Sequence, residues 1–285
     1  MQYKITSKIT VEALATAINL VYHGSGSQLI QFIGSLLNSE SNILKFANKH
    51  QPDFLKGIVI GLKDTNAESL IVSDNPRLDF CRALDYLITS KVLVKNTFES
   101  QVHPNAIISN NAIIEDGVII GDGTVIEHNV VIHHGTVIGK NTIVRANTVV
   151  GAQGFGFEKN VDGTWIRFPH LGKVIIGDNV EIGALNSVCV GALNDTIIHD
   201  GVKTDNLVHI AHNCVVGRNS ILTACTELSG GVVLGEGVWM GPNSSTMQKV
   251  KIDDYALVGL GTAVTKNVEK HNTVAGVPGK VIRRG

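Results

Sequence analysis

The sequence has few aromatic residues and no excess of either charge. Phenylalanine, tryptophan and tyrosine make up only 5% of its 285 residues. No C-x-x-C pair occurs among the four cysteines, which are Cys81, Cys189, Cys214 and Cys225. A disulfide framework or zinc knuckle is therefore not expected. We expect buried thiols in a reducing cytoplasm instead. The formal net charge of -1 gives no electrostatic attraction for nucleic acid or an anionic membrane.

Long apolar runs are also missing. No segment approaches the roughly 18 apolar residues that a transmembrane helix needs. The first residues, "MQYKITSKITVEALATAINL", lack the unbroken apolar core and cleavage site of a signal peptide. We therefore expect a cytoplasmic protein without a transmembrane segment.

What the sequence does have is an internal repeat that begins near Val102. An aliphatic residue recurs at every sixth position, and small or polar residues often follow it, as in "IIGDGT" and "VIGKNT". The first run contains Ile108, Ile114, Ile120, Ile126, Ile132, Ile138, Val144 and Val150. After a break the repeat resumes at Ile176, Ile182 and Val188, shifts by four residues, and continues from Ile198 to Val264.

A period of six predicts a mainly β fold, a parallel β-helix with a triangular cross-section. Each hexad forms one short side and a corner, and three hexads form a coil of 18 residues. Coils stack at about the 4.8 Å spacing of paired strands. The aliphatic residue then points inward, and Gly, Asn and Asp occupy the corners. The period does not give the hand, but hexapeptide-repeat proteins as a class resemble the left-handed parallel β-helix.

Before residue 98 the repeat is absent, and the sequence is typical of a small α/β domain. "TVEALATAINL" has apolar residues at helical spacing, and "GIVIGL" and "SLIVSD" are typical of buried strands. In "DNPRLDFCRALDYLI", Asn75 is the expected N-cap and Pro76 lies in the first turn of an amphipathic helix.

We therefore expect a small α/β domain over residues 1–97, a β-helix over 98–268 and a short tail over 269–285. The β-helix is interrupted by an excursion over 151–173. The excursion is rich in aromatic residues for this chain, namely Phe155, Phe157, Trp165 and Phe168. These rings could form a small core under the loop or line a ligand groove.

The stretch "DNLVHIAHNCVVG", residues 205–217, contains two histidines. The coil of 18 places His212 near a corner, outside the prism, in one column with Asn194 and Gly230. Neighbours in this column should lie about 5 Å apart along the axis. His209 should also face outward, in a different direction.

Three interpretations of His212 compete. It could be a surface or interface histidine without chemistry. It could ligate a metal, but the other histidines of the repeat show no facing pattern, so we expect no metal site; they are His128, His133, His134, His199 and His209. It could also be a general base, because a neutral imidazole accepts a proton near pH 7. Gly230 would then offer its backbone N–H to a developing oxyanion.

The sequence resembles the LpxD family, the UDP-3-O-acylglucosamine N-acyltransferases, over most of its length. The specific motifs are the "GFGF" loop, "GALNDTII" and "DNLVHIAHNCVVG", with "HGSGS", "ILKFANK" and "DNPRLDF" in the N-terminal part. The resemblance implies a homotrimer with active sites between adjacent prisms, with His212 as general base and Gly230 as oxyanion donor. It also implies an N-terminal domain that binds uridine, with Phe46 and Asn48 at the uracil, although their spacing is one residue short.

The sequence also departs from this family. Where the family has "TTIDRGALDDT", this chain has "NSVCVGALNDT", so that Cys189 and Val190 replace an Asp-Arg pair and Asn194 replaces an aspartate. A second histidine of the family falls on Lys249. The tail is too short for the long helix that the family presents to acyl carrier protein. It ends in "AGVPGKVIRR", similar to hexapeptide acetyltransferases that use coenzyme A.

We therefore expect an N-acyltransferase that moves an acyl group from a thioester to the amine of a UDP- or dTDP-linked amino sugar for a cell-surface glycan. Acyl-CoA is favoured over acyl carrier protein as the co-substrate, and no permanently bound cofactor is expected. Asn194 would orient the imidazole or bind the sugar, and Phe155 and Phe157 would shape the groove. One alternative is the lipid A reaction of LpxD itself. Another is a β-helix that binds ligands without catalysis.

Overall fold

The computed structural model describes residues 2–49, 51 and 53–285 and divides into two compact units. The N-terminal unit contains Met1–Asn96 together with Gly156–Leu171. The β-helix unit contains Thr97–Phe155 and Gly172–Gly285. The excursion from the repeat is thus largely a part of the N-terminal unit.

The N-terminal unit is built on a five-stranded sheet with the order β2-β6-β5-β4-β3. Strands β3 to β6 are parallel, and β2 joins β6 in the antiparallel direction. The sheet contains β2 (Tyr22–His23), β3 (Phe32–Ile33), β4 (Ile43–Ala47), β5 (Leu55–Gly61) and β6 (Ala67–Val72). A separate antiparallel ribbon pairs β1 (Tyr3–Ile5) with β7 (Leu93–Lys95).

Two capped helices complete this unit. In α1 (Val11–Ala17) the Thr10 side chain accepts a hydrogen bond from the Ala13 N–H, which satisfies one of the free amides of the first turn. In α2 (Pro76–Thr89) the Asn75 side chain accepts from the Leu78 N–H, and Pro76 is the first helical residue. Both helices and the strands β5 and β6 confirm the elements predicted from the sequence.

The excursion forms an antiparallel hairpin of β17 (Phe157–Lys159) and β18 (Trp165–Arg167). The ring that follows it, Phe168, is only 3% exposed. Its centroid lies 6.0 Å from that of Phe80 and 6.2 Å from that of Phe46. The Arg77 guanidinium lies over the same ring at 5.3 Å. Phe168 is therefore part of the core of the N-terminal unit, so the excursion is attached to this unit by burial.

The burial of Phe168 leads to a prediction about stability. Phe168→Ala should lower the free energy of unfolding of the N-terminal unit by about 3–5 kcal/mol, the usual cost of deleting a buried phenyl ring. Phe155→Ala is the matched control, because the Phe155 ring is 88% exposed and its loss should cost little. Urea denaturation followed by fluorescence measures both. Equal stability of the two variants would contradict the core role of Phe168.

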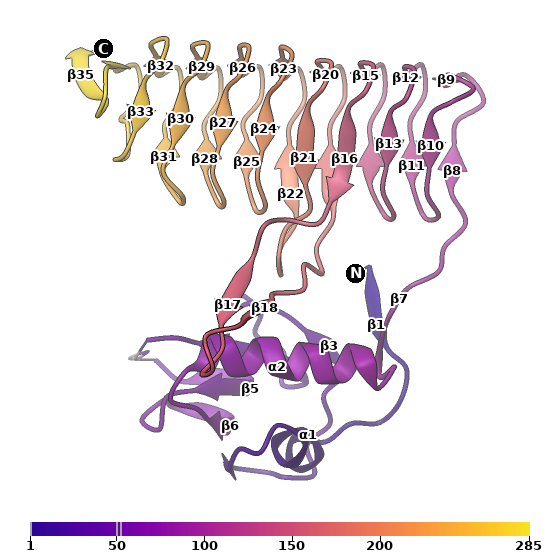
Figure 1. Ribbon diagram of the computed structural model, residues 1–285, viewed down its shortest axis with the longest axis vertical. Helices are drawn as coiled ribbons and strands as arrows, with labels where there is room; N and C mark the ends of the chain where they lie inside the picture. Colours follow the sequence, from indigo (N-terminus) through magenta and orange to yellow (C-terminus); the bar gives the residue numbers. More distant parts are fainter. Residues whose placement is uncertain (1, 50, 52) are drawn as a thin grey trace. The chain divides into compact units, whose positions relative to one another are not determined.

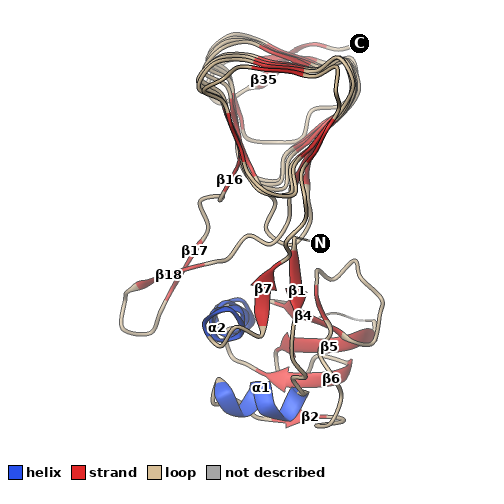
Figure 2. Ribbon diagram, turned by 90° about the vertical axis from the view of Figure 1, so that its right-hand side faces the viewer, coloured by secondary structure: helices blue, strands red, loops and turns tan. Residues whose placement is uncertain are grey.

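The β-helix unit consists of three sheets that enclose a triangular prism (Figures 1 and 2), and all strands are parallel except the last one. We number its faces in chain order. Face 1 contains β8 (Gln101–Val102), β11 (Ile119–Ile120), β14 (Val137–Ile138), β19 (Val174–Ile176), β22 (Thr196–Ile198), β25 (Val215–Val216), β28 (Val233–Leu234) and β31 (Lys251–Ile252).

Face 2 contains β9 (Ile107–Ile108), β12 (Val125–Ile126), β15 (Ile143–Val144), β20 (Glu181–Ile182), β23 (Lys203–Thr204), β26 (Ile221–Leu222), β29 (Trp239–Met240), β32 (Leu257–Val258), β34 (Thr273–Ala275) and β35 (Lys280–Arg283). Face 3 contains β10 (Ile113–Ile114), β13 (Val131–Ile132), β16 (Val149–Ala152), β21 (Ser187–Cys189), β24 (His209–Ile210), β27 (Glu227–Leu228), β30 (Ser245–Thr246) and β33 (Ala263–Val264).

The strand register confirms the hexapeptide β-helix predicted from the repeat. Neighbouring strands pair at a distance of 18 residues, as in Ile113 with Val131. The aliphatic residues of the repeat form one continuous core inside the prism. The corners use residues with positive φ, chiefly Asn and Gly, for which the left-handed conformation costs least.

Two interruptions of this register have different forms. Val149 pairs with Ser187, 38 residues later, because the chain leaves the prism between them. In the next coil Ser187 pairs with His209, a step of 22, whereas Ile197 pairs with Val215 at the usual 18. Four extra residues therefore lie between Val188 and Thr196. They produce the four-residue shift that the sequence shows.

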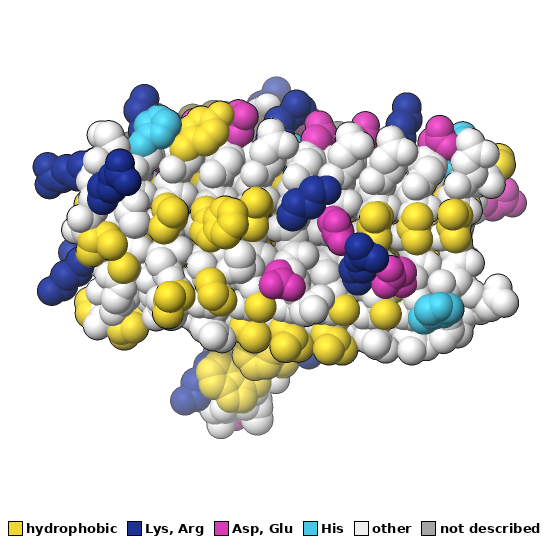
Figure 3. Space-filling model, turned by 90° about the horizontal axis from the view of Figure 1, so that it is seen from above, with side chains coloured by type: hydrophobic (Ala, Val, Ile, Leu, Met, Phe, Trp, Pro, Cys, Tyr) yellow, Lys and Arg dark blue, Asp and Glu magenta, His cyan; other side chains and the backbone are white. Residues whose placement is uncertain are grey.

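The residues expected to form a tail extend the prism. Strand β34 pairs with β32 in parallel, and β35 folds back on β34 in the antiparallel direction. The described part of the chain contains no helix with the length and apolar character needed to span a membrane. The face seen in Figure 3 mixes hydrophobic with charged side chains. On face 2, Arg145 bridges Glu127 and Glu181 at 2.7 and 2.6 Å.

Candidate functional site

His212 lies at the corner where the chain passes from face 3 to face 1. Strand β24 ends at Ile210 and β25 begins at Val215, and His212 is half-buried between them. Its Nδ1 lies 3.0 Å from the Oδ1 of Asn213. The imidazole is thus outside the aliphatic core, and it is hydrogen-bonded to the next residue of the same corner.

Asn213 determines which imidazole nitrogen carries the proton. The Asn213 Oδ1 accepts a hydrogen bond from the Ala192 N–H at 2.9 Å, and its Nδ2 donates to the carbonyl of Asn194 at 3.0 Å. These two bonds fix the orientation of the amide, so its oxygen faces the histidine. The Nδ1 of His212 must then be the donor in the neutral ring. The lone pair is left on Nε2, which is the form a general base needs.

Gly230 lies directly beside this ring in the next coil. The register pairs His209 with Glu227, so Gly230 is the counterpart of His212. A Cβ at Gly230 would lie 2.6 Å from the Cε1 and 2.7 Å from the Nε2 of His212, closer than real Cβ contacts. Only glycine therefore fits beneath the imidazole. The Gly230 N–H has no acceptor within the part of the chain that the structure describes, so it can donate to a ligand.

The corner before His212 is widened by the four extra residues. Asn194 lies in it, one coil before His212, and its side chain is exposed. Its carbonyl accepts a hydrogen bond from the side-chain amide of Asn213. Lys249, where the resembling family has a second histidine, lies two coils from Asn213 in the same column of positive-φ residues, with φ 63° and an exposed side chain.

Two buried cysteines near this corner do not compete with the histidine as nucleophiles. Burial raises the pKa of the Cys214 thiol to about 12, and burial also raises the pKa of Cys189. Both thiols therefore stay protonated near neutral pH and are poor nucleophiles. The described residues also contain no group of three or more His, Cys, Asp and Glu side chains placed to hold a metal ion.

The other predicted site residues lie elsewhere in the chain. Phe46 is half-buried in β4, with its ring 4.8 Å from that of Phe80, and Asn48 is exposed just after this strand. Phe157 belongs to the hairpin of the N-terminal unit, where the Arg167 guanidinium lies 4.6 Å from its ring centroid. Phe155 belongs to the β-helix unit and is largely exposed.

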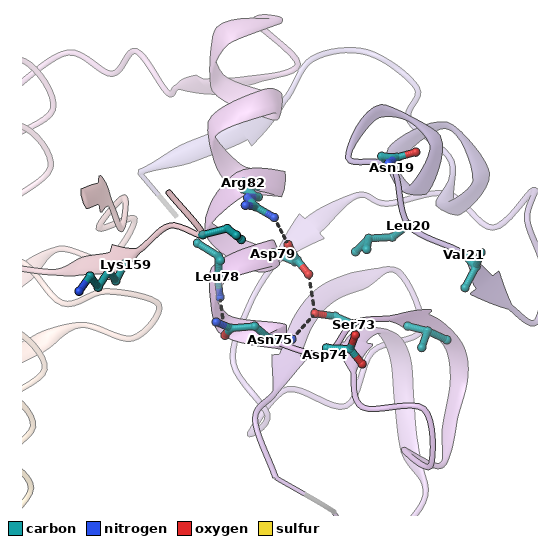
Figure 4. A pocket seen from close by; sticks show the side chains of 12 residues that line it. Asn19, Leu20, Val21, Ser73, Asp74, Asn75, Leu78, Asp79, Arg82 and Lys159 are labelled. Carbon is teal, nitrogen blue, oxygen red and sulfur yellow. Dashed lines mark hydrogen bonds and ion pairs between the residues drawn. The ribbon is translucent and has the colours of Figure 1, made fainter. Parts of the chain in front are cut away.

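Sequence reasoning missed a cavity in the N-terminal unit. It has a volume of about 580 Å³ and lies between the segment before β2, the end of β6, the start of α2 and the β17–β18 hairpin (Figure 4). Its polar wall contains Asp79, which accepts from the Ser73 hydroxyl at 2.6 Å and pairs with Arg82 at 2.8 Å. Ligands of open α/β sheets bind at the carboxyl ends of parallel strands, so the end of β6 was the available signal.

Comparison with known proteins supports the repeat and the resemblance. The family model "Bacterial transferase hexapeptide (six repeats)" matches residues 117–152 and 195–230. Both matched ranges lie in the β-helix unit. The second match ends at Gly230 and contains His212.

Curated relatives carry the name of the family that the sequence resembles. A UDP-3-O-acylglucosamine N-acyltransferase from Herminiimonas arsenicoxydans is 39% identical over 126 residues, which are 44% of this chain and 36% of that protein. One from Dechloromonas aromatica is 52% identical over 83 residues, or 29% of this chain and 24% of that protein. The matches thus span about a third or less of the length of these relatives.

Solved structures show the same fold. LpxA from Acinetobacter baumannii matches with a TM-score of 0.54 and 26% identity, over 64% of this chain and 71% of that chain. A UDP-N-acetylglucosamine acyltransferase from Francisella novicida matches with a TM-score of 0.53 and 24% identity, over 62% of this chain and 65% of that chain. The second likeness concerns the fold alone.

Proposed function

We propose that this chain is an acyltransferase that moves an acyl group from a thioester to the amine of a UDP-linked amino sugar. The observation that carries the proposal is the corner of His212, Asn213 and Gly230. It combines a nitrogen base of defined tautomer with an adjacent N–H that has no acceptor in the described chain. The names of the curated relatives supply the class of acceptor.

The geometry suggests a mechanism in which His212 accepts a proton and the Gly230 N–H stabilises the negative charge of the oxyanion. The sugar amine attacks the thioester carbonyl while the His212 Nε2 removes its proton. The carbonyl oxygen becomes an oxyanion that accepts a hydrogen bond from the Gly230 N–H. When the C–S bond breaks, the leaving thiolate takes the proton from the imidazolium. The products are the amide and the free thiol, and the imidazole returns to its starting form.

The comparisons reverse the preference between the two candidate reactions, which are the LpxD reaction and an acylation that uses acyl-CoA. The relatives are named UDP-3-O-acylglucosamine N-acyltransferases, which favours that acceptor and the LpxD reaction. The candidate donor acyl-CoA is supported by the motif "AGVPGKVIRR", which resembles that of hexapeptide acetyltransferases that use coenzyme A. In this motif Ala275 is the last residue of β34, and Lys280–Arg283 form β35. We keep acyl-CoA as the second candidate donor.

The rest of the proposal concerns assembly and binding. We propose a cytoplasmic homotrimer whose product enters a cell-surface glycan, with the nucleotide bound by the N-terminal unit. Phe46 and Asn48 are proposed at the base, and Phe155, Phe157 and Asn194 at the groove. These assignments rest on the resemblance to the LpxD family.

A product assay tests the proposal. The protein should convert UDP-3-O-acylglucosamine to its N-acylated form, detected as a mass increase of one acyl group. Acyl chains of different lengths are supplied as acyl carrier protein and as coenzyme A thioesters, which separates the two candidate donors. UDP-N-acetylglucosamine, whose amine is blocked, is the control. No product with any donor would favour the non-catalytic alternative.

A further inference from the structure

Face 3 presents a row of polar side chains beside the His212 corner. The row contains Ser187, His209, Glu227 and Ser245, whose strands pair in register. They alternate with the buried residues Val188, Ile210, Leu228 and Thr246, so they point away from the core. His209 and His212 belong to one coil, and Glu227 and Gly230 belong to the next.

The neighbouring face is different in the same coils. On face 1 the corresponding outward residues are Ile175, Ile197, Val215 and Val233, all aliphatic. The His212 corner therefore separates a polar surface from an apolar one. Of these two rows, only the row on face 3 offers side chains that can form hydrogen bonds with a polar ligand at the imidazole.

His209 and Glu227 keep free capacity for such a ligand. Both are half-buried, and they are direct neighbours on paired strands, about 4.8 Å apart in the usual geometry. The Ser229 hydroxyl donates to the Glu227 Oε1 at 3.0 Å, which orients the carboxylate. Throughout residues 2–49, 51 and 53–285, the carboxylate has no cation beside it and the His209 ring has no hydrogen bond. Glu181 on face 2, by contrast, is paired with Arg145.

We propose that His209 and Glu227 bind the hydroxyl groups of the acceptor sugar, so that its ring lies on face 3 with its amine toward His212. A carboxylate accepts hydrogen bonds from sugar hydroxyls, and charge-assisted bonds of this kind are stronger than neutral ones. An imidazole can accept from one hydroxyl or donate to another. The proposal rests on the proposed function, because it assigns the acceptor subsite of the same corner.

The test uses Glu227→Gln and His209→Phe in the full chain, with UDP-glucosamine and UDP-3-O-acylglucosamine as probes. Glu227→Gln should weaken the calorimetric Kd and the KM for the sugar by about ten- to hundredfold, the usual effect of losing a charged hydrogen bond. His209→Phe should weaken them less. The KM for the acyl donor should stay unchanged in both variants. Glu181→Gln and His199→Phe are matched controls on other parts of the prism and should leave sugar affinity unchanged.

The outcomes separate this subsite from the proposed function. If the wild-type protein transfers acyl groups and both variants bind the sugars normally, the subsite is wrong and the function stands. If no transfer occurs but Glu227→Gln still weakens sugar binding, the function is wrong and the subsite stands. Absence of both binding and turnover in the wild-type protein contradicts both.

Discussion

His212→Ala is expected to lower acyl-transfer turnover by about 10²–10⁴-fold, the usual effect of removing a general base. The imidazole lies outside the aliphatic core and is half-buried, so its loss should leave the β-helix folded. The rate is measured by the product assay at saturating acceptor and donor, and folding by circular dichroism. The loss should appear in kcat, because the base acts as the amine attacks.

A matched control is available earlier in the same coil. His199 is also half-buried at a corner of the prism, but it lies between faces 1 and 2. His199→Ala should therefore keep wild-type turnover. Asn213→Ala should lie between the two, because it removes the bond that keeps the proton on Nδ1 while the imidazole remains. Normal turnover in a folded His212→Ala variant would remove this residue from the mechanism.

The sequence predicted the prism well because its cause is local. One aliphatic residue per hexad specifies the inward side of each strand, and the repeat covers enough coils to exclude other periods. The helices were predictable for a similar reason, since Thr10 and Asn75 cap them with side chains a few residues away. Structural features that depend on residues close in sequence could therefore be predicted.

Features decided by distant contacts could not be predicted. The aromatic excursion has no period, so only the packing of Phe168 on Phe80 shows which unit it belongs to. The role of Asn213 depends on Ala192 and Asn194, about one coil away and inside a four-residue insertion. The insertion was visible as a shift of phase, but a shift does not say which groups meet across it.

Replacing Gly230 by alanine is expected to reduce turnover by at least about 10²-fold, comparable to the loss of an oxyanion donor. The added methyl group would lie 2.6 Å from the His212 Cε1, so the imidazole must move from its position. Gly230 is not among the glycines with positive φ, so alanine adds no backbone strain there. The stability loss, measured by thermal unfolding, should therefore be small beside the loss of activity.

Gly230→Pro adds a Cβ at the same place as alanine and also removes the N–H of this residue. Proline removes the N–H itself, and since that N–H has no acceptor in the described chain, no internal hydrogen bond is lost with it. If the N–H stabilises the oxyanion, the proline variant should be at least as inactive as the alanine variant. Gly259→Ala is the control, because its new Cβ would approach other atoms no closer than 3.1 Å, far from His212 in sequence, and should keep wild-type turnover. A folded Gly230→Pro variant with wild-type turnover would exclude this N–H as the donor. Normal turnover in Gly230→Ala would show that the chemistry does not depend on where the His212 ring lies.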